Sequence, residues 1–126
     1  MSLTFCYFEL IIVAKSIAST PTNESSCPVP KRLKQARLRC NLSQRSLGIA
    51  AGMDVASASA RMNQYERGKH VPDYQTLCQL ALVVGAPVAY FYANDEEAEL
   101  LLNMATLSAE QQELVCDLVK RINFAV

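Results

Sequence analysis

The stretch RLKQARLRCNLSQRSLGIAAGMDVASASARMNQYERGKHVP, from Arg32 to Pro72, decides the fold of this chain. Its central part begins with the pattern of a short helix. Ser43 is a favourable residue for capping the start of that helix, and Leu47 and Ala50 follow at helical spacing. Gly52 stands where the helix should end, because glycine readily adopts the left-handed conformation of a helix terminus.

A second short helix is predicted to follow after a turn and to end at about Glu66. Ser57 or Ser59 is positioned to cap it, and Met62 and Tyr65 would form its inward face. The remaining residues of this helix are mostly polar or small. Two short helices joined by a turn, with polar residues on the outer face of the second, have the geometry that enters the major groove of DNA.

Flanking segments are predicted to be helical as well. Residues 31–40 form a first helix, with Pro30 in its first turn and Asn41 as a left-handed cap. Its inward residues are Leu33, Ala36 and either Leu38 or Cys40.

A further helix is predicted over residues 74–84. Asp73 is a good cap for this helix, and Gly85 ends it. The inward stripe of that helix is Leu77, Leu80, Ala81 and Val84, and residues 89–92 add a short helix or turn with aromatic side chains on the core.

Two further helices are expected beyond residue 93. The segment 95–107 has acidic residues in its first turn, where they favour the positive end of a helix dipole. The sequence SAEQ (108–111) is a capping box that opens a last helix to about Asn123. The apolar stripe of that helix is Leu114, Val115, Leu118, Val119 and Ile122. The stripe could pack onto the preceding helices or form the seam of a homodimer, which we favour because palindromic half-sites require a dimer.

The first 29 residues are predicted to be an apolar arm followed by a linker. The segment LTFCYFELIIV (3–13) suits packing against the chain itself or a partner, and STPTNESSCPVP (19–30) is a polar segment punctuated by prolines. A secretory signal peptide is disfavoured because the start lacks basic residues and Glu9 interrupts the apolar run.

Composition excludes several classes of function. The 126 residues contain 51% hydrophobic residues, enough for a core, but no apolar run long enough to span a membrane. Five cysteines without a CxxC pair argue against zinc or a disulfide framework and fit a reducing cytoplasm. The only histidine, His70, has no triad partners, and the chain has no HExxH or phosphate-cradling glycine loop. We therefore expect no enzymatic activity, metal or cofactor.

The net charge of zero conceals a strong polarity. Residues 31–72 contain nine Lys or Arg against two acidic residues, a net charge of +7. Residues 73–126 contain two Lys or Arg against eight acidic residues, a net charge of −6. Such a division is typical of a protein with one surface for a polyanion and another for protein contacts.

Four segments in order resemble the lambda-repressor/Cro class of helix-turn-helix regulators, the xenobiotic-response-element type. These segments are LKQAR (33–37), LSQRSLGIAAG (42–52), MNQYERGKHVP (62–72) and LCQLALVVGAP (77–87). The resemblance implies an all-α fold, in which a five-helix DNA-binding domain over residues 30–93 precedes one or two C-terminal helices. Residues 1–29 would then be an arm and linker, and residues 94–126 a helical extension for dimerisation.

One spacing departs from that family. About nine residues usually separate the turn glycine from the aromatic residue before the glutamate, but Gly52 and Tyr65 are thirteen apart. The segment MDVASASA (53–60) therefore carries about four additional residues. These residues form either a longer turn or an extended start of the recognition helix.

The resemblance also implies roles for individual residues. Phosphate or supporting contacts fall to Gln44, Arg45, Arg67 and Lys69, with Lys34 and Arg39 as further candidates. The residues that would face the groove are Ser59, Ala60 and Gln64, flanked by Arg61 and Asn63, and the additional residues could bring Ser57 within reach. Gln64 and Asn63 can pair with adenine, and Arg61 with guanine or a phosphate. Arg37 and Glu66 would form an internal ion pair that joins the first helix to the recognition helix.

These observations predict a cytoplasmic, sequence-specific transcriptional regulator. It would bind a palindromic operator on double-stranded DNA as a homodimer and would act as a repressor. The alternative is an antitoxin-like or other protein-interaction module that binds a partner protein as well as DNA. A third, weaker possibility is a repressor whose C-terminal helices sense a ligand.

Overall fold

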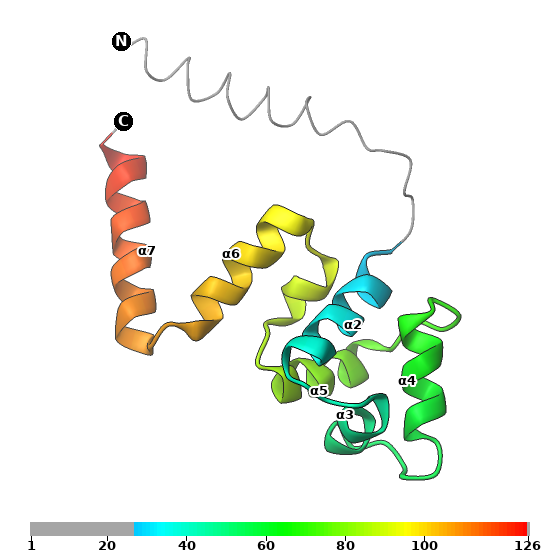
Figure 1. Cartoon of the computed structure of the whole chain (residues 1–126). Coiled ribbons are helices and arrows are strands. Elements are labelled where there is room, and N and C mark those ends of the chain that lie inside the picture. Colours follow the sequence, from blue (N-terminus) through cyan, green and yellow to red (C-terminus); the bar gives the residue numbers. More distant parts are fainter. Residues whose placement is uncertain (1–26, 126) are drawn as a thin grey trace. The chain divides into compact units, whose positions relative to one another are not determined.

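The computed structural model describes residues 27–125, so the predictions for the N-terminal arm lie outside the described residues. Within this range there are six α-helices, one 3₁₀ helix and no strand, which confirms the all-α fold class. Element labels follow Figure 1 and begin at α2. No helix in the described range is both long and apolar enough to cross a membrane.

Residues 27–109 form one compact unit, in which five helices and the 3₁₀ helix surround a single core (Figure 1). The elements of this unit are α2 (Val29–Arg39), α3 (Gln44–Ala50), α4 (Ala58–Glu66), α5 (Tyr74–Val84), η1 (Val88–Tyr92) and α6 (Asp95–Thr106). Its largest fully buried side chains are Phe91, Leu33, Leu47, Met62, Leu77 and Leu80. Burial of each such side chain contributes about 1.5–3 kcal/mol, so this core is the main source of stability. The remaining helix, α7 (Ala109–Phe124), lies largely outside this unit and is described by itself.

The first helix, α2, begins two residues before the predicted start. Pro30 occupies its first turn, where the missing N–H of proline costs nothing. Of the two alternatives for the inward residue near its end, Cys40 packs against the core, whereas Leu38 is exposed. Asn41 has a φ of 54°, as expected for the left-handed residue after a helix.

The caps of α3 and α5 agree with the sequence prediction. The Ser43 hydroxyl accepts a hydrogen bond from the Ser46 amide at 3.0 Å, and the Asp73 carboxylate accepts one from the Thr76 amide at 2.7 Å. That hydrogen bond is the main reason why the pKa of Asp73 lies below its ordinary value. Gly85 ends α5 in the left-handed conformation with a φ of 64°.

The helix α6 begins with a capping box that the sequence analysis did not identify. The Asn94 side chain accepts from the Glu97 amide at 2.8 Å, and the Glu97 carboxylate accepts from the Asn94 amide at 3.3 Å. Just before it, η1 buries Tyr90 and Phe91 while Tyr92 remains half exposed. The buried aromatic pair joins η1 to the core, and Ala98 of α6 packs there too.

Candidate nucleic-acid interface

The helices α3 and α4 pack closely because a glycine lies at their crossing. A Cβ atom on Gly48 would approach the Cβ of Ala58 to 2.9 Å and the Cγ of Met62 to 3.1 Å. The sequence analysis placed Ala50 at helical spacing with Leu47, but Ala50 is exposed and Gly48 and Leu47 are the buried residues of α3. A glycine inside a short helix was the signal that could have revealed this close approach.

The four additional residues form a longer turn rather than an extension of the recognition helix. Residues 54–57 lie before α4, which begins only at Ala58. Asp54 organises this turn, since its carboxylate accepts from the Ala56 amide at 3.0 Å and its carbonyl accepts from the Ala58 amide at 2.9 Å. Ser57 occupies the position before the helix but makes no side-chain cap, and neither Ser57 nor Ser59 has the predicted capping role.

One face of α4 is buried and the opposite face is free of intramolecular packing. Ala58, Met62 and Tyr65 lie in the core. The exposed residues of the helix are Ser59, Ala60, Arg61, Asn63 and Gln64. All five are among the predicted contact residues, whereas Ser57 is half-buried. The outward face therefore carries hydroxyl and amide groups that can pair with base edges.

An ion pair joins α2 to the end of α4. The Arg37 Nε donates to Glu66 Oε1 at 2.6 Å and its Nη2 donates to Oε2 at 3.1 Å. This two-pronged hydrogen bonding raises the pKa of Arg37. The side-chain amide nitrogen of Gln44, Nε2, also donates to Glu66 Oε2 at 2.9 Å. Glu66 therefore fixes the start of α3 beside the end of α4, and Gln44 is held in a supporting position.

Three exposed cations lie in the segments that Glu66 brings together. Arg45 is in the first turn of α3, next to Gln44, while Arg67 and Lys69 follow α4 directly. The loop after α4 is held in place because the Gln64 carbonyl accepts from the Lys69 amide at 3.0 Å. Within the described residues, none of these three cations takes part in a salt bridge. Their charge is therefore available to an external anion.

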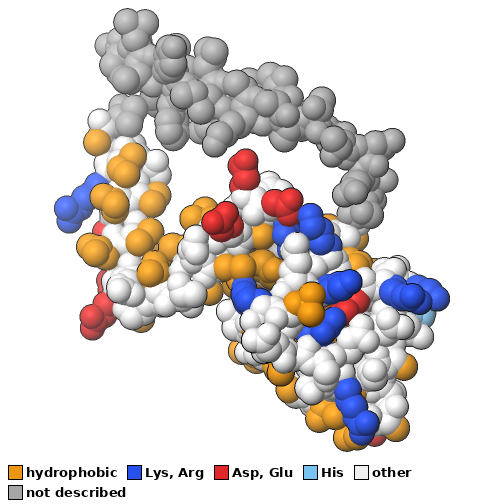
Figure 2. Space-filling model, viewed as in Figure 1, with side chains coloured by type: hydrophobic (Ala, Val, Ile, Leu, Met, Phe, Trp, Pro, Cys, Tyr) orange, Lys and Arg blue, Asp and Glu red, His pale blue; other side chains and the backbone are white. Residues whose placement is uncertain are grey.

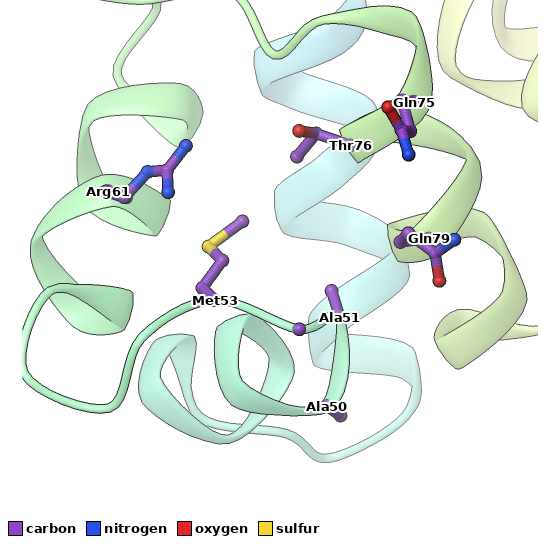
Figure 3. Close-up of a pocket in the computed structure, with 8 residues that line it drawn as sticks. Ala50, Ala51, Met53, Arg61, Gln75, Thr76 and Gln79 are labelled. Carbon is purple, nitrogen blue, oxygen red and sulfur yellow. The ribbon is translucent and has the colours of Figure 1, made fainter.

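Arg61 lies apart from those cations, on the flank of α4 that faces α5. Figure 3 shows it pointing across an open hollow toward Thr76 and Gln75, with Met53 and Ala51 at the floor. The hollow has a volume of about 400 Å³. The Arg61 guanidinium donates to the Tyr65 hydroxyl at 3.3 Å, and its charge contributes to the lowered pKa of Asp73.

Several cations counted in the basic stretch serve internal contacts instead. Arg32 is buried, and its guanidinium donates twice to the Ala93 carbonyl and once to Asp95 at 2.8 Å. Lys31 pairs with the same carboxylate, and the two cations hold the pKa of Asp95 below its ordinary value. Arg39, a predicted phosphate candidate, donates to the Val84 carbonyl at 2.9 Å. The net charge of +7 therefore overstates the charge available to a polyanion.

The spacing of Arg32 could have identified its internal role. It lies three residues after Val29 and four before Ala36, on the same face of α2 as the buried Leu33.

Figure 2 shows Lys and Arg side chains over the compact unit, including some beside the acidic residues at the start of α6. In the described part of the chain, no group of three or more His, Cys, Asp or Glu residues could hold a metal ion.

Comparison with known proteins identifies the family. The chain matches no protein-family model and no curated protein sequence. Among solved structures it is similar to the crystal structure of the transcriptional regulator BswR, with 45% sequence identity and a TM-score of 0.67. The match covers 73% of this chain and 92% of BswR. At this identity and coverage, the chain belongs to the same family of transcriptional regulators as BswR.

Proposed function

We propose that this protein is a transcriptional regulator of the lambda-repressor/Cro type, which binds a double-stranded DNA operator in a sequence-specific manner and acts as a repressor. The observation that carries the proposal is the exposed polar face of α4 beside three cations that have no acidic partner among residues 27–125. The similarity to BswR supports a role in transcription. We assign the protein no catalytic activity and expect it to act in the cytoplasm.

In the proposed complex, α4 enters the major groove. Asn63 and Gln64 pair with base edges, while Ser59 and Ala60 contact smaller groups such as a thymine methyl. Arg45, Arg67 and Lys69 contact phosphates, which supply most of the affinity and fix the register of α4 on the duplex. Gln44 supports this arrangement from its hydrogen bond with Glu66.

The first prediction concerns the salt dependence of binding. Fluorescence anisotropy with random-sequence duplex DNA should show affinity that falls steeply with salt, because bound cations release counterions from the duplex. Replacing Arg45, Arg67 and Lys69 together by Gln removes about three phosphate contacts and should lower the log–log slope by roughly three. Lys31→Gln is the matched control, since Lys31 is already paired with Asp95. Equal slopes for the triple variant and the wild type would refute the assigned surface.

The second prediction concerns sequence readout. After selection of an operator from random duplexes, Gln64→Ala and Asn63→Ala should each relax the preference at one or two positions by about 1–3 kcal/mol. Lys69→Gln should instead weaken binding evenly across sequences, because a phosphate contact carries no base information. Unchanged preferences in both α4 variants would mean that this face does not read bases.

A protein-interaction function is the second candidate, and one observation favours it. An apolar hollow of about 350 Å³ lies between η1 and α6, lined by Tyr92, Leu100 and Leu101 among others. Tyr92 and Leu100 are more than half exposed there. If the folded protein binds no DNA at low salt, a pull-down with the protein should be used to find the partner. Variants of the residues that line this hollow then test whether the partner binds there.

A further inference from the structure

The hollow beside α4 is lined by three separate segments of the chain. Its volume of about 400 Å³ lies in the range of sites that hold small molecules. The turn after α3 supplies an apolar floor at the buried Met53, Arg61 of α4 forms one wall, and Gln75 and Gln79 of α5 form the other (Figure 3). Met53 begins the segment that carries the four additional residues, so the family pattern does not by itself supply this floor.

Arg61 brings to the hollow a positive charge without an acidic partner in the described part of the chain. It is exposed, belongs to no salt bridge among residues 27–125, and donates to the Tyr65 hydroxyl at 3.3 Å. Asp73 is close enough to feel this charge, but the main cause of its lowered pKa is the Thr76 amide, which donates to that carboxylate at 2.7 Å. A guanidinium with unused N–H groups can hold a phosphate through two parallel hydrogen bonds.

Two carboxamides line the opposite wall. Gln75 and Gln79 lie four residues apart and therefore on the same side of α5 (Figure 3). Both are exposed, and neither side chain makes a hydrogen bond within the residues that the structure describes. A carboxamide offers a donor and an acceptor side by side, and this pair matches the edge of a nucleobase, that of adenine above all. The thioether of Met53 suits contact with the ring of such a base.

We propose that this hollow binds a free nucleoside monophosphate, with the phosphate on Arg61, the base edge on Gln75 and Gln79, and the ring against Met53. A simple anion would leave both carboxamides unused, and a neutral molecule would leave the guanidinium unpaired, whereas a nucleotide engages all three groups. Because Arg61 belongs to α4, the occupant would contact the helix that is proposed to enter the major groove. This site goes beyond the DNA-binding proposal and can be tested without DNA, so either proposal can fail while the other stands.

The test is nuclear magnetic resonance of the isotope-labelled full chain, titrated with AMP and, in parallel, with inorganic phosphate. AMP should bind saturably with a Kd below about 1 mM and should shift the side-chain amide signals of Gln75 and Gln79. Inorganic phosphate lacks a base and should bind at least roughly tenfold more weakly. Equal affinities for AMP and phosphate would reduce the hollow to an anion site and overturn the nucleotide assignment. The absence of saturable shifts with AMP, GMP, CMP and UMP would overturn it as well.

Variants locate the bound nucleotide. Arg61→Gln should weaken AMP binding roughly tenfold or more, because it removes charge-assisted hydrogen bonds to the phosphate. Gln79→Leu keeps the size of the side chain but cannot pair with a base, and it should weaken AMP binding by roughly threefold to tenfold. The matched control is Arg45→Gln, which removes the same charge at the far end of α3 from the hollow and should change the Kd by less than about twofold. Equal effects of the two arginine variants would contradict the assigned site.

Duplex DNA distinguishes a free nucleotide from the backbone of an operator, because both carry phosphates and bases. The AMP-induced shifts of Gln75 and Gln79 should appear in the complete absence of DNA. If random-sequence duplex DNA shifts these two signals and none of the free nucleotides does, the hollow belongs to the DNA-binding surface and the free-nucleotide assignment is wrong. The salt dependence of DNA binding, measured separately, reports on the DNA-binding proposal alone.

Discussion

Replacing Glu66 by alanine is expected to lower the free energy of unfolding by about 3–5 kcal/mol, because the change leaves a largely buried arginine without its anion. The Glu66 side chain is 4% exposed and that of Arg37 is 12% exposed. The same change removes the acceptor for Gln44, so the start of α3 loses its link to the end of α4. Denaturant unfolding measures the loss of stability, and DNA affinity should fall with it.

A double-mutant cycle separates the cost of an unpaired cation from the value of the pair. Arg37→Ala with Glu66→Ala should be less destabilising than Glu66→Ala alone, since no charge is then left without a partner. Glu66→Gln keeps the shape and one acceptor, and should lie between the wild type and Glu66→Ala. Wild-type stability together with lost DNA binding in Glu66→Ala would contradict the structural role and assign Glu66 to the DNA surface itself.

Replacing Gly48 by valine is expected to destabilise the protein by about 3 kcal/mol, because it overfills the contact between α3 and α4. Even the first added carbon would lie 2.9 Å from the Ala58 Cβ and 3.2 Å from the Ala58 carbonyl. The backbone of α4 must therefore move, and the exposed polar face of α4 moves with it. Unfolding experiments measure the stability, and operator affinity should fall more than the stability loss alone explains.

Ala50→Val is the matched control for Gly48→Val. Ala50 belongs to the same helix but is exposed, so valine there carries only its small helix-propensity cost. A compensating change also tests the mechanism: Ala58→Gly should recover part of the stability of Gly48→Ala, because it removes the nearest atom. Equal effects of valine at positions 48 and 50 would show that the spacing between α3 and α4 is not limited by Gly48.

The sequence by itself determined the order and the type of the helices in residues 27–125. Local features carry this information: Ser43 and Asp73 cap their helices through bonds to amides three residues away, and Gly85 ends α5 through its own backbone conformation. The inward stripe of α5 followed from a period of 3.6 residues, and its four predicted members are the buried ones. Such signals depend on neighbours within one or two turns, so they can be read without the fold.

Helical spacing places Arg32 on the inward face of α2, but only the tertiary structure decided what its charge meets there and how α3 meets α4. Arg32 and Arg45 have the same chemistry, but the first is buried against Ala93, sixty-one residues away, while the second is exposed. The importance of Gly48 likewise depends on Ala58, which a turn of variable length brings to it. Contacts between residues distant in the chain depend on how whole helices pack, and helical periodicity carries no information about that packing.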